Sequence, residues 1–309
     1  MDNINKLQRD ILIDEIIKKM SSDKNTIFCS ADFGAKSLDH LRNKFKKQFI
    51  HCGISEQAMF DVATGLALDK KKIFVYAMAP FISLRALEQI KCGPGIMNLP
   101  VSIISVGVGL GYANAGPTHY ACEDYICLRA IPNINIFTFS DNTSVKLIIK
   151  KILKKPIFSY LRLDREFLPD LSRYFKNIDS DFRVTNTEKN FRNKIVLVSN
   201  GYMTHECLKI KEKYPSKFEV IDLIKSFPIS KKIKNYISKS KKIVCVDEQI
   251  KTSSISNTLS SFVIENSIKI DISCIALPNK NFFENIGRKK MLKKFGLLSE
   301  QILKKINFK

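Results

Sequence analysis

Residues 100–108 read PVSIISVGV, a run in which almost every side chain is apolar or small. A strand that is apolar throughout has both faces buried, as in parallel sheets covered by helices. Runs of the same kind alternate with helical patterns on either side: TIFCSAD at 26–32, KIFVYAM at 72–78, INIFTFS at 134–140 and IFSYLRL at 157–163. This alternation predicts an α/β fold with a mostly parallel sheet.

The alternation continues in the second half of the chain. The strand patterns there are IVLVSNG at 195–201, FEVIDL at 218–223, KIVCVDEQ at 242–249 and IDISCIAL at 270–277. The stretch between the halves is polar and shows no sustained period. We predict two domains, 1–168 and 192–309, each a mostly parallel sheet covered by helices, joined by a linker over 169–191.

The formal net charge of +21 raises the question of nucleic-acid binding. Only ten of the 51 basic residues are arginine, the residue best suited to bidentate phosphate and base contacts. Only Arg129, Lys146 and Lys150 fall within residues 101–150, where the motifs gather. We therefore expect no nucleic-acid partner and attribute the charge to a compositional bias towards lysine.

We also expect no membrane association and a cytoplasmic location. Apolar runs such as 101–104 and 243–246 are far shorter than the roughly 20 residues that span a bilayer. The N-terminal MDNINKLQRD lacks the apolar segment of a secretory signal. The eight cysteines form no C-x-x-C pair, as expected for free thiols in a reducing compartment.

Three loops combine unusual content with the position where open α/β sheets bind ligands, beyond the carboxyl ends of strands. They are CSADFGAKS at 29–37, IHCGISEQ at 50–57 and the glycine-rich GVGLGYANAGPTHY at 107–120. The G-x-G-x-G of residues 107–111 lacks the G-x-G-x-x-G spacing of a dinucleotide site.

Glu56 opens a helical pattern, where a carboxylate is favoured by the helix dipole alone. The helix would bury one apolar stripe, made of Ala58, Met59, Val62, Ala63, Leu66 and Ala67. The local pattern therefore leaves open whether Glu56 is a helix-start acid or a catalytic residue.

A combination of motifs favours a catalytic role for Glu56. GISEQAMFDVATGLAL at 53–68, GPTH at 116–119 and CLRAIPNINIFTFSD at 127–141 together resemble the pyrimidine-binding domain of transketolase and of 1-deoxyxylulose-5-phosphate synthase. The second half resembles the C-terminal domain of the same enzymes. The resemblance runs from about Leu7 to the end and implies a transferase of the transketolase type, which moves a two-carbon ketol unit between sugar phosphates.

The resemblance implies which residues bind the cofactor in the active site. In that family, the glutamate of the first motif bonds the pyrimidine ring of thiamine diphosphate and promotes its reactive tautomer. Glu56 matches this glutamate. Phe81 matches an aromatic residue that stacks on the pyrimidine, and His119 a histidine near the thiazolium and the substrate oxygens, where it can stabilise developing charge.

It also implies substrate contacts. Asp32, Lys36 and Ser37 fall in the loop that helps to position the sugar, and His119 is expected to contact it as well. Arg165, in LRLDRE, matches an arginine that grips the substrate phosphate, a role suited to a planar fork of donors.

One family motif is absent from the sequence. The Mg²⁺ and diphosphate of the cofactor are held in this family through a Gly-Asp-Gly motif followed by an asparagine, and the sequence contains no Gly-Asp-Gly. No metal-ligating residue is therefore assigned here. We expect the C-terminal subunit of a split transketolase, which associates with itself and with a separate N-terminal subunit that binds Mg²⁺ and diphosphate.

Departures from the family pattern limit the substrate assignment. Transketolases carry an acidic pair just before Gly-Pro-Thr-His, where this chain reads YANAG at 112–116. A modified sugar therefore stays open beside the usual sugar phosphates. A pyruvate-decarboxylating synthase, a 2-oxo acid dehydrogenase subunit and a non-catalytic assembly subunit are the alternatives. The second domain, with DEQIKTSSIS in place of a glycine-rich turn, is expected to serve assembly more than chemistry.

Overall fold

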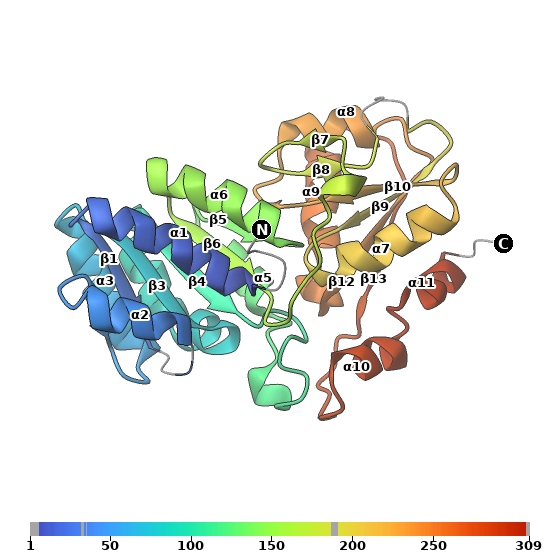
Figure 1. Ribbon diagram of the computed structural model, residues 1–309. Coiled ribbons are helices and arrows are strands. Elements are labelled where there is room, and N and C mark those ends of the chain that lie inside the picture. The colour runs from blue at the N-terminus through green and yellow to red at the C-terminus, as the bar shows by residue number, and fades with distance from the viewer. Residues whose placement is uncertain (1–5, 32–33, 35, 187–190, 307–309) are drawn as a thin grey trace.

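The computed structural model describes residues 6–31, 34, 36–186 and 191–306, and it contains two sheets that lie side by side (Figure 1). The first sheet has seven strands in the order β11-β5-β6-β4-β3-β1-β2. Its strands are β1 (Thr26–Ser30), β2 (Phe49–His51), β3 (Lys72–Met78), β4 (Val101–Val106), β5 (Asn135–Thr138), β6 (Ser159–Leu163) and β11 (Lys225–Phe227). All pair in parallel except β11, which is antiparallel to β5.

Helices cover both faces of this sheet, as the continuously apolar strands predict. One face packs against α1 (Gln8–Ser22), α2 (Lys36–Lys44) and α6 (Asn142–Lys154). The other face packs against α3 (Glu56–Leu68), α4 (Leu87–Ile90) and α5 (Asp124–Arg129). The run 100–108 becomes the central strand β4, whose residues are all buried.

The helical segment between β3 and β4 is irregular. The four-residue α4 lies between two π-helical turns, η1 (Phe81–Arg85) and η2 (Lys91–Gly95). Pro94 lies inside η2, where it lacks an amide donor, and glycines flank it. The short edge strand β2 was not predicted from the sequence.

The expected buried stripe of α3 is wrong at two positions. Met59 and Ala63 are fully buried and Ala67 is nearly so, but Ala58 and Val62 are exposed. Helix α3 is apolar around more of its circumference than the sheet can cover, so periodicity alone overstated the buried face.

The second sheet has six strands in the order β13-β12-β9-β10-β8-β7. They are β7 (Asn177–Ile178), β8 (Arg183–Val184), β9 (Ile195–Ser199), β10 (Phe218–Asp222), β12 (Lys242–Ile250) and β13 (Ile272–Leu277). Strands β7 and β8 fall within residues 169–191, so part of the expected linker extends the second sheet by antiparallel pairing with β10. The domain boundaries themselves remain a prediction.

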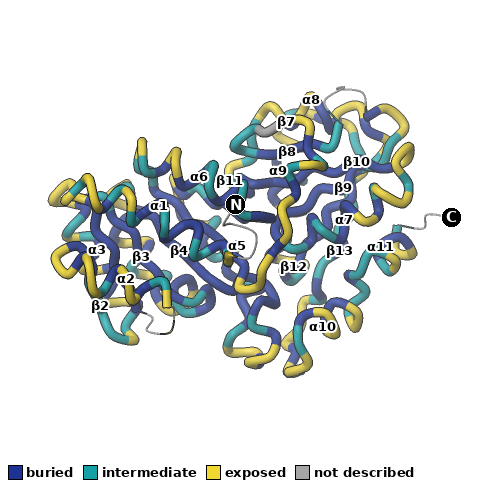
Figure 2. Tube along the Cα trace, in the orientation of Figure 1, coloured by how far each residue is buried: buried dark blue, intermediate teal, exposed yellow. Residues whose placement is uncertain are grey.

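Helices also flank the second sheet. Helix α7 (Tyr202–Lys213) shares an apolar cluster with α10 (Arg288–Phe295) and α11 (Ser299–Lys305). Helices α8 (Lys234–Ile237) and α9 (Ile255–Glu265) belong instead to a cluster that contains residues of both sheets. Four short 3₁₀ turns complete the chain: η3 (Pro117–His119), η4 (Ser172–Tyr174), η5 (Lys231–Ile233) and η6 (Lys251–Ser253). Figure 2 shows the inner strands of both sheets as buried, whereas β2 and β13 are partly intermediate.

Polar contacts also join the two halves. Arg183, which is 1% exposed, places Nη1 2.8 Å from Asp141 Oδ2 and Nη2 2.6 Å from Asp222 Oδ2. The hydroxyl of Tyr125 donates to the carbonyl of Ser226 at 2.8 Å. Because Asp141 and Tyr125 belong to the first half while Asp222 and Ser226 belong to the second, the halves share a buried polar interface.

Within the residues described, no helix is both long and apolar enough to cross a bilayer.

The first prediction concerns the buried pair of Arg162 and Asp124. Asp124 is fully buried, binds Arg162 Nε at 2.8 Å and Nη2 at 3.0 Å, and accepts a hydrogen bond from Tyr160 at 2.7 Å. Asp124→Asn leaves a buried guanidinium without its counter-charge, so we expect a loss of about 3–5 kcal/mol in the free energy of unfolding. Equilibrium unfolding in urea measures this loss in the free energy of unfolding.

Asp14→Asn is the control, because Asp14 pairs with Lys6 at a half-exposed site. We expect it to cost less than about 1 kcal/mol. Equal losses for the two variants would contradict the prediction.

Candidate functional site

Four of the predicted site residues follow the carboxyl ends of parallel strands in the first sheet. Glu56 follows β2, Phe81 follows β3, His119 follows β4 and Arg165 follows β6. Since these strands are parallel, the four residues gather at one edge, where open α/β sheets bind ligands.

Glu56 is the first residue of α3 and is only 2% exposed. Its Oε2 lies 2.6 Å from Nη1 of Arg85, whose side chain is 41% exposed. The Arg85 guanidinium in turn lies 4.5 Å from the centre of the Phe81 ring. Arg85 thus connects two predicted site residues. Arg85 was not among the residues predicted from the sequence, although it lies four residues after Phe81.

His119 ends the 3₁₀ turn η3, and its half-buried ring meets Phe81. The ring centres are 5.4 Å apart with an interplanar angle of 74°, an edge-on contact. His119 Nδ1 lies 2.9 Å from the hydroxyl of Thr118. Glu56, Arg85, Phe81 and His119 therefore form one continuous series of contacts.

Arg165 extends this series through the loop that departs from the family pattern. Its guanidinium lies 4.5 Å from the centre of the Tyr112 ring, and Nη1 donates to Asn114 Oδ1 at 3.0 Å. The Tyr112 ring centre is 6.3 Å from that of His119. Tyr112 thus lies between the predicted phosphate-binding arginine and the predicted catalytic histidine, and Asn114 contacts that arginine.

The third predicted loop is only partly described. Asp32 lies outside the described residues. Lys36 and Ser37 begin α2 at the same edge of the sheet, but outside this series of contacts. Lys36 is exposed, whereas the hydroxyl of Ser37 is buried and has no hydrogen-bond partner in the described part of the chain.

Two cysteines lie below the loop that carries Glu56. Cys29 is buried in β1, and Cys52 follows β2 with its amide donating to the Ser30 carbonyl at 2.9 Å. A hydrogen bond between the two thiols lowers the pKa of Cys52, while that bond and burial raise the pKa of Cys29. This contact links the turn before α3 to strand β1.

No group of three or more His, Cys, Asp or Glu side chains suited to a metal ion occurs in residues 6–31, 34, 36–186 and 191–306.

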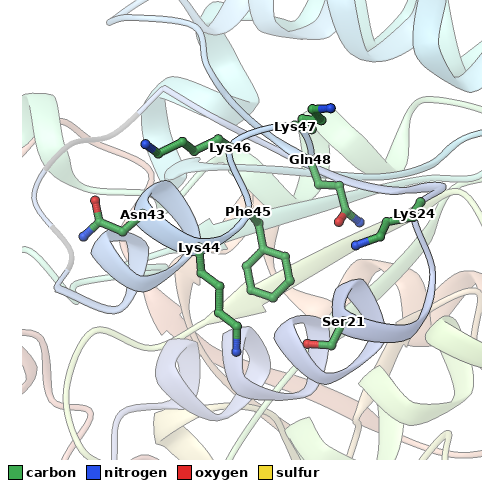
Figure 3. Close-up of a pocket in the computed structure, with 8 residues that line it drawn as sticks. All are labelled: Ser21, Lys24, Asn43, Lys44, Phe45, Lys46, Lys47 and Gln48. Atoms are coloured by element: carbon green, nitrogen blue, oxygen red, sulfur yellow. The ribbon is translucent and has the colours of Figure 1, made fainter.

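A cavity of about 800 Å³ lies elsewhere, lined by lysines around Phe45. Its residues precede β1 and β2, so it opens at the amino ends of these strands, away from Glu56. The ammonium groups of Lys24, Lys44, Lys46 and Lys47 point in different directions in Figure 3. Because they do not converge, we do not assign the candidate site to this cavity.

Two protein-domain families match consecutive parts of the chain. The one described as "Transketolase, pyrimidine binding domain" matches residues 8–170, and "Transketolase, C-terminal domain" matches residues 185–302. Together they cover every strand of the two sheets except β7 and β8.

Individual proteins agree with these matches. The chain is 26% identical to one subunit of the apulose-4-phosphate transketolase of Phocaeicola vulgatus over 87% of this chain and 86% of that protein. It is also 26% identical to the 1-deoxy-D-xylulose-5-phosphate synthase of Halothermothrix orenii, over 86% of this chain but 42% of that protein. A solved structure described as a split gene transketolase, inactive beta4 tetramer, shares the fold with a TM-score of 0.83 at 21% identity, covering 98% of this chain and 97% of the other.

The second prediction concerns the support of Tyr112. A Cβ atom on Gly107 would lie 2.0 Å from the Tyr112 ring, whereas a Cβ on Gly116 meets nothing within 4 Å. Both glycines have left-handed backbones, with φ of +85° and +86°. Ala at either position therefore strains the backbone, by roughly 1–3 kcal/mol, but only Gly107→Ala must also move the ring.

We expect Gly107→Ala to unfold at lower urea concentration than Gly116→Ala and to change the near-ultraviolet dichroism of the tyrosines. Indistinguishable variants would show that the ring is not held by Gly107.

Proposed function

Because this chain belongs to the transketolase family, we propose that it is the C-terminal subunit of a thiamine-diphosphate-dependent transketolase. The enzyme would transfer a two-carbon ketol unit between sugar substrates together with a separate N-terminal subunit. The similar length of the apulose-4-phosphate transketolase subunit supports the split arrangement.

One observation carries this proposal: a buried carboxylate, an aromatic ring and a histidine are connected through Arg85 in one series of contacts at the carboxyl edge of the first sheet. Glu56 is 2% exposed and lies at the head of a helix, beside Arg85 and Phe81. A buried carboxylate at such an edge is a good candidate for proton chemistry, since burial strengthens its interaction with a bound partner.

The residues present fit the pyrimidine part of thiamine diphosphate. A carboxylate accepts a proton or a hydrogen bond from a ring nitrogen, and an aromatic side chain offers a flat apolar surface to a heterocycle. Glu56 would hold the ring nitrogen and Phe81 would contact the ring. When bound, the cofactor supplies a nucleophilic carbon that attacks a ketose carbonyl.

The roles of this chain's own groups follow from their contacts. Glu56 would exchange a proton with the bound ring, and Arg85 would hold the carboxylate in place through its 2.6 Å ion pair. When the Thr118 hydroxyl donates to Nδ1 of His119, the ring proton lies on Nε2, from which it can be donated to a substrate oxygen. Arg165 would bind a phosphate at the far end of the substrate.

The remaining assignments concern partners and location. We propose that the N-terminal subunit binds the diphosphate and Mg²⁺, and that this chain also associates with itself. The relative described as a tetramer of beta chains supports self-association. The eight cysteines are free thiols, which supports a cytoplasmic location. Asp32, Lys36 and Ser37 are kept as candidates for binding the sugar.

The substrate is proposed as a ketose phosphate or a modified sugar. In place of an acidic pair the loop presents the ring of Tyr112 near His119 and the amide of Asn114 at Arg165. An aromatic ring and an amide favour different hydroxyl arrangements from a carboxylate. The match to a deoxyxylulose-phosphate synthase supports the alternative of a pyruvate-decarboxylating enzyme.

The third prediction tests Glu56. In a complex with the N-terminal subunit, Glu56→Gln removes the proton acceptor, and we expect turnover of fructose 6-phosphate to fall on the order of 10²- to 10⁴-fold. Glu88→Gln changes an exposed glutamate on α4 and is expected to keep full turnover. Size-exclusion chromatography checks that both variants still form the complex.

Unchanged turnover in Glu56→Gln would favour the alternative of a non-catalytic assembly subunit. Faster release of CO₂ from pyruvate than ketol transfer would favour the synthase.

The fourth prediction tests the need for a second polypeptide. The purified chain with thiamine diphosphate and Mg²⁺ is expected to show no ketol transfer, because the groups that hold the diphosphate would be missing. Adding a subunit that carries Gly-Asp-Gly and the following asparagine should restore it in proportion to the complex formed. Robust turnover by the chain alone would contradict the proposal.

A further inference from the structure

A buried arginine of the second domain, Arg288, contacts residues that support the candidate site. Arg288 begins α10, is 5% exposed, and its guanidinium lies 4.0 Å from the centre of the Tyr202 ring. It binds one carboxylate from each half of the molecule, Asp164 and Glu248. A guanidinium has five donors in a rigid plane, so two bound carboxylates are fixed relative to each other.

On the side of the first sheet, Arg288 fixes the turn that carries Arg165. Nη1 of Arg288 lies 2.9 Å from Oδ1 and 2.7 Å from Oδ2 of Asp164. The same Oδ1 accepts the amide of Glu166 at 2.8 Å, so the Asp164 carboxylate closes the turn around Arg165. Asp164 is 2% exposed, which limits its freedom to reorient.

On the side of the second sheet, Arg288 fixes the support of the loop that carries His119. Its Nε lies 2.7 Å from Oε1 of Glu248, near the end of β12. Glu248 also lies against Gly109, because a Cβ on Gly109 would lie 2.6 Å from Glu248 Oε2. Glu248 thus packs directly against the start of the glycine-rich loop.

The other end of the same loop is held by the next two residues of β12. Gln249 Nε2 donates to the Ala121 carbonyl at 3.1 Å, and the Ile250 amide donates to that of Cys122 at 3.2 Å. Gly109 and Ala121 close the loop by pairing with each other through two hydrogen bonds. Since His119 lies inside this closed loop, its position depends on β12.

We propose that Arg288 is a positioning residue, which holds Arg165 and the His119 loop in one fixed arrangement for a phosphorylated substrate. This inference rests on the proposed function for its substrate, but not for its geometry. It also gives the second domain a part in the chemistry, beyond the assembly role expected from the sequence.

Arg183 provides a matched control. It is similarly buried, lies 4.5 Å from an aromatic ring centre, that of Phe175, and binds carboxylates from both halves. Its partners Asp141 and Asp222 make no contact with Arg165 or the His119 loop in the structure as described. Arg183→Lys therefore also removes a guanidinium buried between the halves, but it does not disturb Arg165 or the His119 loop.

The fifth prediction compares Arg288→Lys with Arg183→Lys in the complex with the N-terminal subunit. Lysine keeps the charge but cannot bind both carboxylates in one plane. We expect the KM for fructose 6-phosphate to rise on the order of tenfold in Arg288→Lys, with a much smaller change for fructose. Arg183→Lys should keep both KM values within about twofold of wild type, although both variants lose thermal stability.

A second measurement uses the chain alone and does not require activity. Hydrogen–deuterium exchange should accelerate at residues 107–122 and 164–167 in Arg288→Lys, but not in Arg183→Lys. If Arg288→Lys does not fold, the isosteric Glu248→Gln serves instead, and it should loosen 107–122 while leaving 164–167 unchanged.

The outcomes separate this inference from the proposed function. Unchanged exchange at both segments, or an equal rise of KM in Arg183→Lys, would overturn the positioning role. If Arg288→Lys exchanges faster at both segments but the wild-type complex shows no ketol transfer, the positioning role stands and the proposed function is refuted.

Discussion

Two guanidinium groups, those of Arg183 and Arg288, are buried between the two halves of this protein, and each binds carboxylates from both halves. A buried charge is costly unless its partners stay in place, and removing one partner typically costs about 3–5 kcal/mol. The two sheets therefore cannot separate or slide without leaving such a charge unpaired. Pairing of β11 with β5 adds backbone hydrogen bonds to the same interface.

This constraint matters because the candidate site lies at the edge of the first sheet but does not rest on that sheet alone. Parallel strands bring Glu56, Phe81, His119 and Arg165 to one edge. The loop that carries His119 packs against β12 of the second sheet at one end and is hydrogen-bonded to β12 at the other. The arrangement of these groups therefore depends on both domains, although the groups themselves come from the first.

Most strands could be predicted from the sequence because buried strands appear as continuous apolar runs such as 100–108. Prediction was less accurate where the burial of a residue depends on which element packs against it. Helix α3 is apolar on two sides, so its pattern could not tell that Val62 would be 42% exposed. The polar stretch 169–191 contributes β7 and β8 to the second sheet, but two-residue strands are too short to leave a periodic signal. Arg85 escaped notice because its link to Glu56 joins residues on two different helical segments.

By itself, the sequence determined the α/β class, the order of the strands along the chain and the motif residues Glu56, Phe81 and His119, because hydrophobic periodicity and local motifs are properties of short segments. Only the tertiary structure decided that Arg85 pairs with Glu56, that Tyr112 and Asn114 meet Arg165, and that Arg288 joins the two halves beside the site. These contacts connect residues far apart in the chain. Which distant residues meet is fixed by packing and by the need to pair buried charges, and no local pattern encodes it.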